Sequence, residues 1–305
     1  MITMSSVIRK PWFSRPADVA GRGWIIATRR ALLALSLVAL AGCSVVRLAY
    51  NQADTLLATW LDRQFDFDRT QSALVRDAAT RWLAWQRRAQ LPEMAATLAQ
   101  VRRDWERPLG AADVCRWADR LPGWLDATWQ QIRPDALAVA RQLGPAQWTH
   151  LEAHFARERR EQAEEAADQS PAERRQAQID RLAERYERLL GPLDAAQRTR
   201  VGQLVDRLGD GSGWASERER QQQELLATLR QLPALPAADA AVQLDALWAR
   251  WRTGTPAQRA LREQTQQAHC QLLAELQASA SPRQREHARR QWATWEADLR
   301  ALAAD

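Results

Sequence analysis

Two histidines one helical turn apart have the spacing best suited to metal chemistry in this chain. His150 and His154 stand at i and i+4, which lets one helix face share a zinc ion. A zinc-protease motif needs glutamate directly beside a histidine, whereas Glu152 lies midway between the two. Catalytic zinc usually has three protein ligands, and Glu158 is the remaining candidate. The alternative is that both histidines are solvated or pack between helices, and we expect no cofactor.

Carboxylates give no clearer sign of catalysis. Three of them stand close together in the sequence: Asp62, Asp66 and Asp68. They could form a cation or acid–base cluster, but Arg63 and Arg69 alternate with them, which is typical of a solvated charged face. His269 and His287 have no ligand-spaced companion. The sequence contains no glycine-rich phosphate loop, serine elbow or catalytic Cys/His pair, so we predict that the protein is not an enzyme.

Tryptophan gives a stronger signal than the ionisable residues. Six of the 15 tryptophans form Trp-x-x-Trp pairs: Trp82 and Trp85, Trp248 and Trp251, and Trp292 and Trp295. This spacing puts both indoles on one helix face, and arginines flank every pair. We take these six as candidates for a binding surface, either a client groove, a glycan-stacking surface or a contact with lipid. The alternative is helix packing, because a buried indole contributes a large apolar area.

A cysteine follows an apolar run near the start of the chain. Arg29 and Arg30 precede residues 31–42, which are apolar or small and end in Leu40-Ala41-Gly42-Cys43. This is the layout of a secretory signal, and it is too short to span a bilayer. It resembles the bacterial lipoprotein signal, in which the peptide is cut before the cysteine and the cysteine is acylated.

That resemblance implies a signal peptide over residues 1–42 and a palmitate-type lipid anchor on Cys43, with residues 43–50 as anchor and tether. The membrane would then be one partner. Ser44 stands where aspartate would suggest retention at the inner membrane, which favours the periplasmic face of the outer membrane.

The charge of the mature chain excludes nucleic acid as a partner. The whole chain has 43 basic and 37 acidic residues. The predicted signal peptide over residues 1–42 contains six of the basic residues and one of the acidic residues. Removing it leaves 37 and 36, a formal net charge of +1. Nucleic-acid binding needs a clustered basic excess.

Two cysteines, Cys115 and Cys270, remain after removal of the signal peptide and lipidation of Cys43. They either form one disulfide in an oxidising compartment or stay free as small buried apolar residues.

Helical periodicity runs through the chain, and strand signals are nearly absent. Ser170, Thr255 and Ser281 each precede proline and are followed three residues later by Glu or Gln, which predicts capped helix starts; Asp194 has the same box without proline. The expected helix breaks are Pro92, 108–110, Pro134, 144–145, 191–192, 209–213 and 232–236. We predict an all-α, elongated bundle of about ten helices, divided at 209–213 into a helical domain over 51–208 and a C-terminal region over 214–305.

Several short patterns resemble a Gram-negative lipoprotein family of unknown function. They are Leu48-Ala49-Tyr50-Asn51, Asp54, Leu61-Asp62, Phe65-Asp66, Trp85-Gln86-Arg87, Gln90-Leu91-Pro92, Trp214 and Glu217-Arg218. The family pattern has His and Glu where this chain has Gln86 and Gln90. The resemblance implies an all-helical lipoprotein without an assigned activity. Leu143 to Gln147 and Leu193 to Gln197 are also similar to the Leu-Thr-x-x-Gln motif of periplasmic helical chaperones, although capped helix starts look alike.

These observations predict a non-enzymatic binding or scaffold module for envelope proteins, with chaperone-like binding of unfolded clients as a close variant. The alternative is cell-wall glycan binding or hydrolysis, with a carboxylate pair and tryptophan stacking surfaces.

Overall fold

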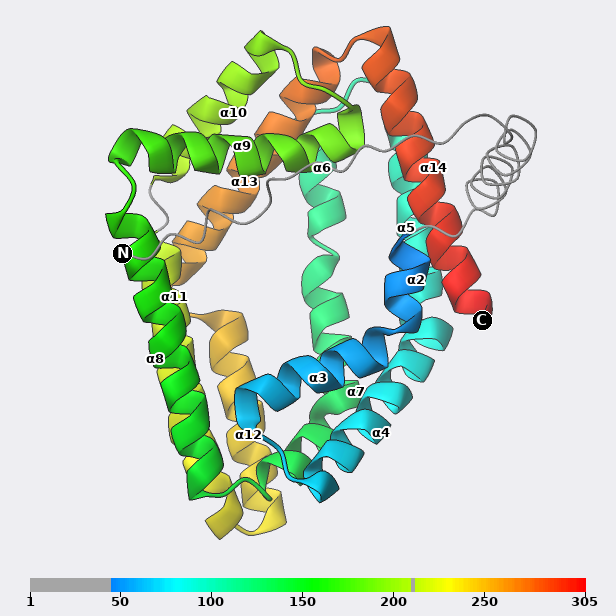
Figure 1. The fold of residues 1–305 in the computed structure, drawn as a ribbon. Coiled ribbons are helices and arrows are strands. Elements are labelled where there is room, and N and C mark those ends of the chain that lie inside the picture. Colours follow the sequence, from blue (N-terminus) through cyan, green and yellow to red (C-terminus); the bar gives the residue numbers. More distant parts are fainter. Residues whose placement is uncertain (1–44, 210–211) are drawn as a thin grey trace, which may run out of the picture. The chain divides into compact units, whose positions relative to one another are not determined.

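The computed structural model describes residues 45–209 and 212–305, so the predicted signal peptide and Cys43 lie outside the described residues. Within these ranges all regular secondary structure is helical, which confirms the predicted fold class (Figure 1). The elements are α2 (Val45–Asn51), α3 (Ala53–Phe65), α4 (Arg69–Trp85), a π-helical turn (Gln86–Gln90), α5 (Leu91–Asp104), α6 (Ala111–Ala118), α7 (Leu121–Ala140), α8 (Pro145–Ala167), α9 (Pro171–Leu190), α10 (Ala195–Leu208), α11 (Ser212–Gln231), a 3₁₀ turn (Leu232–Ala234), α12 (Ala237–Thr253), α13 (Pro256–Ala278) and α14 (Pro282–Ala304).

The predicted capping boxes are confirmed. Ser170, Asp194, Thr255 and Ser281 begin α9, α10, α13 and α14. Each side chain accepts the backbone N–H of the third helical residue, whose own Glu or Gln side chain accepts the N–H of the cap. Such a cap stabilises a helix by about 1 kcal/mol because it satisfies backbone donors that have no partner within the helix.

Two expected breaks are wrong: Pro92 and Pro134 both lie inside helical segments. Pro134 is in the interior of α7, where a proline removes a single backbone hydrogen bond and the helix can continue with a kink. Before Pro92, α4 runs into α5 through the π-helical turn, in which the N–H of Leu91 donates to the carbonyl of Gln86. The wider turn carries the chain into Pro92 without ending the helix.

Two hydrophobic clusters form the core of residues 46–305, which are one compact unit. The first combines residues of α5, α6, α9 and α10 with α13 and α14, and its centre includes Leu190, Val201 and Leu276. The second combines α7 and α8 with α11 and α12, around Leu151 and Leu232. Each cluster takes residues from both sides of 209–213, so the two regions predicted from the sequence share both cores.

Glutamines of the capping boxes also join distant helix ends. Gln71 and Gln147, each the third residue of its helix, donate to each other's side-chain oxygens at 3.1 and 2.5 Å. Gln197 and Gln284 form the same reciprocal pair at 3.1 and 2.8 Å. Gln197 is fully buried, so an unpaired amide there would cost free energy. Both chaperone-like patterns end in one of these glutamines, Gln147 or Gln197, which here cap and join helices.

Cys115 on α6 and Cys270 on α13 form a disulfide, with Cα atoms 5.5 Å apart, across 155 residues of sequence. This is one of the two alternatives that the sequence left open.

Among the described residues, no helix combines the length and the hydropathy needed to cross a bilayer.

We expect reduction of this disulfide to lower the free energy of unfolding by about 2–4 kcal/mol, because the bridge restricts the unfolded chain. The measurement is urea unfolding of residues 46–305, in which Cys115 and Cys270 are the only cysteines, with and without reductant. The Cys115→Ser/Cys270→Ser variant is the control and should not respond to reductant. Equal midpoints for the oxidised and reduced wild type would contradict the prediction.

Candidate functional site: a cavity walled by tryptophan

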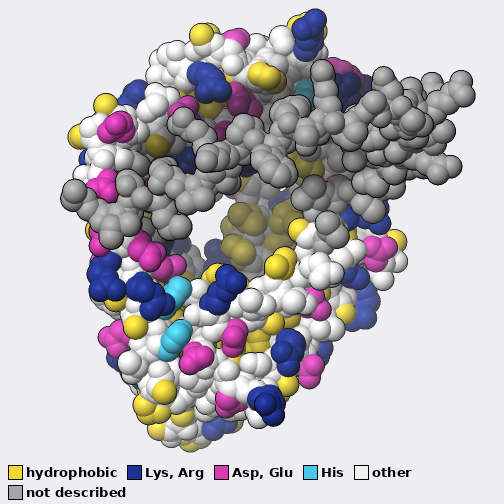
Figure 2. Space-filling view, in the orientation of Figure 1, with side chains coloured by type: hydrophobic (Ala, Val, Ile, Leu, Met, Phe, Trp, Pro, Cys, Tyr) yellow, Lys and Arg dark blue, Asp and Glu magenta, His cyan; other side chains and the backbone are white. Residues whose placement is uncertain are grey.

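An apolar cavity of about 430 Å³ lies between five helices, within the range of small-ligand sites. In space-filling view, one face of the described residues is hollowed, and hydrophobic side chains lie in the hollow (Figure 2). The cavity is lined by Leu57, Leu61, Phe65, Phe67, Val75, Ala78, Ala79, Trp82, Thr128, Trp129, Ile132, Asp135, Ala136, Val139, Ala140, Leu143, Leu225, Leu229, Leu244, Leu247, Trp248 and Trp251.

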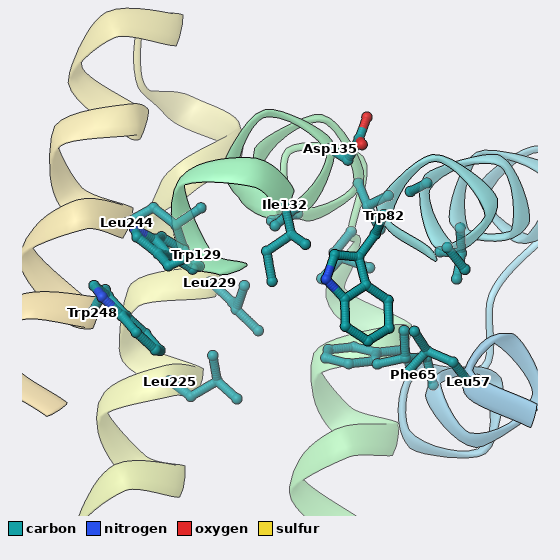
Figure 3. A pocket seen from close by; sticks show the side chains of 18 of the residues that line it. Leu57, Phe65, Trp82, Trp129, Ile132, Asp135, Leu225, Leu229, Leu244 and Trp248 are labelled. Carbon is teal, nitrogen blue, oxygen red and sulfur yellow. The ribbon is translucent and has the colours of Figure 1, made fainter. Parts of the chain in front are cut away.

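Three of the six candidate tryptophans meet at this cavity. Trp82 comes from α4, and Trp248 and Trp251 come from α12. A fourth, Trp129 on α7, was not among the candidates because it has no partner at Trp-x-x-Trp spacing. Figure 3 shows Trp82 facing the pair Trp129 and Trp248 across the cavity, with Leu225 and Leu229 between them.

A repeated sequence pattern could have identified Trp129. Leu-Asp-Ala-x-Trp-x-x-x-Arg occurs at residues 125–133 and again at 244–252. In the structure these two copies lie on α7 and α12 and bind each other. Asp245 accepts hydrogen bonds from Trp129 Nε1 at 3.1 Å and from Arg133 at 2.6 Å. Asp126 accepts in return from Trp248 Nε1 at 3.1 Å and from Arg252 at 2.7 and 3.1 Å.

This reciprocal latch, formed by Asp126, Trp129 and Arg133 with Asp245, Trp248 and Arg252, fixes the aromatic wall. The two indoles stack with centroids 5.1 Å apart and an angle of 11° between the rings. Hydrogen bonds from Arg252, and then from Trp248, lower the pKa of Asp126, although burial acts in the opposite direction. Asp126 therefore stays ionised at neutral pH and holds both donors.

The other two cavity tryptophans differ in their hydrogen bonding. Trp129 and Trp248 donate to the latch aspartates, whereas Trp82 Nε1 and Trp251 Nε1 are shielded from solvent and have no hydrogen-bond partner within residues 45–209 and 212–305. In Figure 3 the indole nitrogen of Trp82 points toward the interior of the cavity. At least one unpaired indole N–H is therefore directed toward the apolar cavity, although neighbouring atoms cover it.

Charge is confined to the edge of the cavity. Asp135 is a lining residue, but its carboxylate points away from Trp82 and Ile132 in Figure 3 and pairs with Arg81 at 2.6 Å. The remaining polar lining residue is Thr128, which is hydrogen-bonded to the side chain of Gln90 at 3.2 Å.

The remaining candidate tryptophans do not line the cavity. Trp292 is buried in the first hydrophobic cluster and Trp295 packs against it, with their ring centroids 5.1 Å apart. Trp105 packs edge-on against Trp292 at 5.8 Å. Trp85 ends α4, next to the π-helical turn. Only part of the tryptophan signal therefore marks the site.

Of the candidate metal ligands, the structure brings His154 and Glu158 together, whereas His150 contacts the backbone of α3. His150 Nε2 lies 3.2 Å from the carbonyl oxygen of Arg63, and His154 Nε2 lies 3.5 Å from Glu158. No group of three or more metal-ligating side chains occurs within residues 45–209 and 212–305.

The three clustered aspartates shape the turn between α3 and α4. Asp62 Oδ1 accepts the N–H of Phe67 at 3.2 Å. Asp66 adopts the left-handed conformation that ends α3, with φ of 52°, and Asp68 caps α4. Their roles are structural, because each carboxylate or backbone conformation ends or begins a helix.

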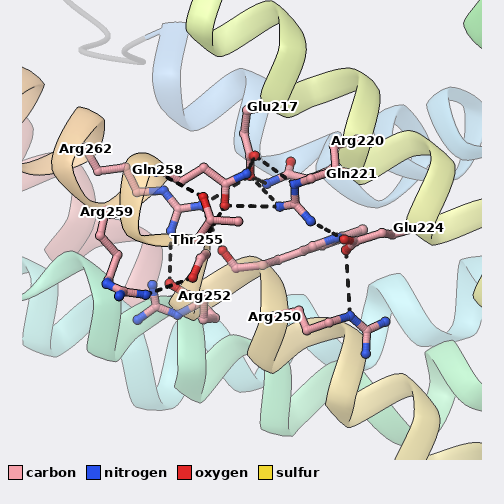
Figure 4. A network of polar contacts seen from close by, with 12 residues as sticks. Glu217, Arg220, Gln221, Glu224, Arg250, Arg252, Thr255, Gln258, Arg259 and Arg262 are labelled. Atoms are coloured by element: carbon pink, nitrogen blue, oxygen red, sulfur yellow. Dashed lines mark hydrogen bonds and ion pairs between the residues drawn. The ribbon is translucent and has the colours of Figure 1, made fainter.

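The buried carboxylate of Glu217 joins α11 to the start of α13, close to the end of α12 that carries Arg252 (Figure 4). Glu217 is 6% exposed and accepts hydrogen bonds from Arg220 at 2.8 and 3.0 Å, from Gln221 and from Gln258. Arg262 lies 3.5 Å from Glu217 and also donates to the carbonyls of Trp251 and Arg252 at 2.9 Å. Arg220 and Arg262 thus compensate one buried charge, and Arg262 also caps the end of α12.

Three residues of the short patterns that resemble the lipoprotein family, Tyr50, Gln86 and Gln90, contact one another in the structure. The hydroxyl of Tyr50 donates to Gln86 at 2.8 Å, and Gln86 donates to Gln90 at 3.1 Å. Gln90 is 4% exposed and donates to the carbonyl of Trp124 at 2.8 Å. This row of hydrogen bonds joins α2, the π-helical turn and α7, and it reaches the cavity through Thr128.

The family model of DUF6279, a family of unknown function, matches residues 63–250. The chain belongs to this family. The matched part contains both copies of the latch pattern except for the last two residues of the second, and most of the cavity lining. No curated protein and no solved structure matches the chain.

We expect Asp126→Ala to lower the free energy of unfolding by about 1 kcal/mol, because it leaves the donors of Trp248 and Arg252 without their acceptor in a partly solvated site. Asp245→Ala should have a similar effect, and the double variant should cost less than the sum, since either change frees the aromatic wall. Urea unfolding followed by circular dichroism measures this, with Glu161→Ala on the exposed face of α8 as the control. Strict additivity would argue against a cooperative latch.

Proposed function

We propose that this protein is a non-enzymatic binding protein of the bacterial envelope, anchored by a lipid on Cys43, which holds an apolar group of its partner in the tryptophan-walled cavity. The observation that carries the proposal is the cavity itself. Its lining is apolar apart from Thr128 and Asp135, and its size is that of a ligand site rather than a packing defect.

Three features support an envelope location. The pattern before Cys43 is that of a lipoprotein signal, and the disulfide between Cys115 and Cys270 is typical of an oxidising compartment. A third feature lies shortly after the anchor position. Leu56 and Trp60 on α3 are 58% and 57% exposed, and tryptophan favours membrane interfaces.

The size of the cavity limits what the partner can insert. A volume of about 430 Å³ suits one side chain or one alkyl chain rather than an extended segment of an unfolded client. This volume therefore favours a binding module that holds one apolar group of a partner over a chaperone that binds unfolded clients. Glycan stacking needs accessible indole faces beside polar groups, whereas Trp129 and Trp248 stack on each other and bind aspartates.

Lipidation is tested by growing cells with labelled palmitate. We expect label on the wild type and none on Cys43→Ser, because the proposed anchor is attached through the sulfur of Cys43. Cys115→Ser is the control and should retain the label. Label on Cys43→Ser, or an unlabelled wild type, would refute the anchor.

Binding is tested with the apolar fluorophore N-phenylnaphthylamine and residues 46–305, which contain both hydrophobic cores. We expect saturable binding to the wild type. Ala136→Leu should abolish it while raising the free energy of unfolding by about 0.5–2 kcal/mol, as cavity-filling changes commonly do. Ala163→Leu on exposed α8 controls for added apolar surface. If Ala136→Leu still binds the fluorophore as the wild type does, the cavity is not the site.

A further inference from the structure

The lining of the cavity offers unpaired indole N–H groups, and its carboxylate is paired at the edge. Among the described residues, Trp82 Nε1 and Trp251 Nε1 have no hydrogen-bond partner; the first is directed toward the cavity, and both are covered by neighbouring atoms. A water molecule in a cavity needs two to four polar partners, so a single indole N–H in apolar surroundings holds water poorly. A ligand with an oxygen acceptor would satisfy this donor once the Trp82 indole turns toward it, while the apolar part of the ligand fills the remaining volume.

The acceptor must be neutral. The cation nearest in sequence to Trp82 is Arg81, which is bound to Asp135 at the edge and is 55% exposed. Arg133 and Arg252 are bound to Asp245 and Asp126. An anion inside the cavity would lose its hydration without gaining a counter-charge, which is costly. A carboxylate is therefore disfavoured, and an ester carbonyl fits.

Helix α3 indicates where such a ligand comes from. Its inner side contributes Leu57, Leu61 and Phe65 to the cavity, and its outer side exposes Leu56 and Trp60. No residue of this helix is fully buried. Helix α3 thus carries apolar residues on its cavity side and on its exposed side, and in sequence it follows the proposed anchor after α2. An exposed tryptophan at such a place is typical of a membrane interface.

We infer that the cavity binds one ester-linked acyl chain of a glycerolipid, with Trp82 Nε1 donating a hydrogen bond to the ester carbonyl and the alkyl chain lying between α3, α7 and the Trp129–Trp248 wall. The inference rests on the proposed function, since it names the apolar group that the cavity holds. Burial of each methylene favours binding, and the single donor sets the depth of the polar end.

The test is displacement of N-phenylnaphthylamine from residues 46–305 by two probes of equal chain length, monododecanoylglycerol and dodecanoate. We expect the neutral ester to compete at least about tenfold better than the carboxylate, because only the carboxylate must lose its charge hydration. Trp82→Phe should weaken the ester by about three- to tenfold more than it weakens the fluorophore, because only the ester loses a hydrogen bond.

Trp292→Phe is the matched control. Its indole N–H is also buried without a partner, but it lies in the first hydrophobic cluster. It should alter neither ester nor fluorophore binding. Equal or better competition by dodecanoate, no displacement by the ester, or equal weakening of ester and fluorophore in Trp82→Phe would each overturn the inference. If the fluorophore binds and Ala136→Leu blocks it, the proposed function stands even when the ester fails.

Discussion

Two helices that are distant in sequence, α7 and α12, are held together by aspartates that each bind the tryptophan and arginine of the other helix. The two copies of Leu-Asp-Ala-x-Trp-x-x-x-Arg run in opposite directions, so every contact is made twice. The stacked indoles between them form one wall of the cavity. Because the indole N–H groups are satisfied outside the cavity, the wall presents only carbon to its interior.

Throughout the site, charged groups lie at the periphery and apolar groups line the interior. The carboxylates of Asp126, Asp135 and Asp245 all pair with arginine at the periphery, where solvent reduces the cost of their charge. Glu217, a buried carboxylate near the end of α12, is compensated by Arg220 and Arg262. The interior is left apolar beside an unpaired indole N–H, so the binding that we propose would derive its selectivity from shape and from one hydrogen bond.

The family match and the cavity largely coincide. The matched residues 63–250 contain the lining contributed by α4, α7 and α11 and most of that from α12. Leu57 and Leu61 of α3 precede the match, and α13 and α14, which complete the first core, follow it. The patterns around Tyr50 and Gln86, which resembled a lipoprotein family, meet as one row of hydrogen bonds that ends beside the cavity.

Local chemistry in the sequence determined the helices and their starts, because a cap such as Ser170 or Thr255 acts on residues three positions away. It also placed Trp82, Trp248 and Trp251 among the binding candidates, since their spacing puts indoles on a common face. The helix breaks predicted from the sequence at Pro92 and Pro134 were wrong. The helical path continues past both prolines, through a π-helical turn before Pro92 and as α-helix around Pro134, although each proline lacks a backbone N–H donor. Which tryptophans line the cavity, and which, like Trp292, fill a core, depended on contacts between helices more than 100 residues apart. Those contacts form only when the whole chain has folded, so only the tertiary structure decided them.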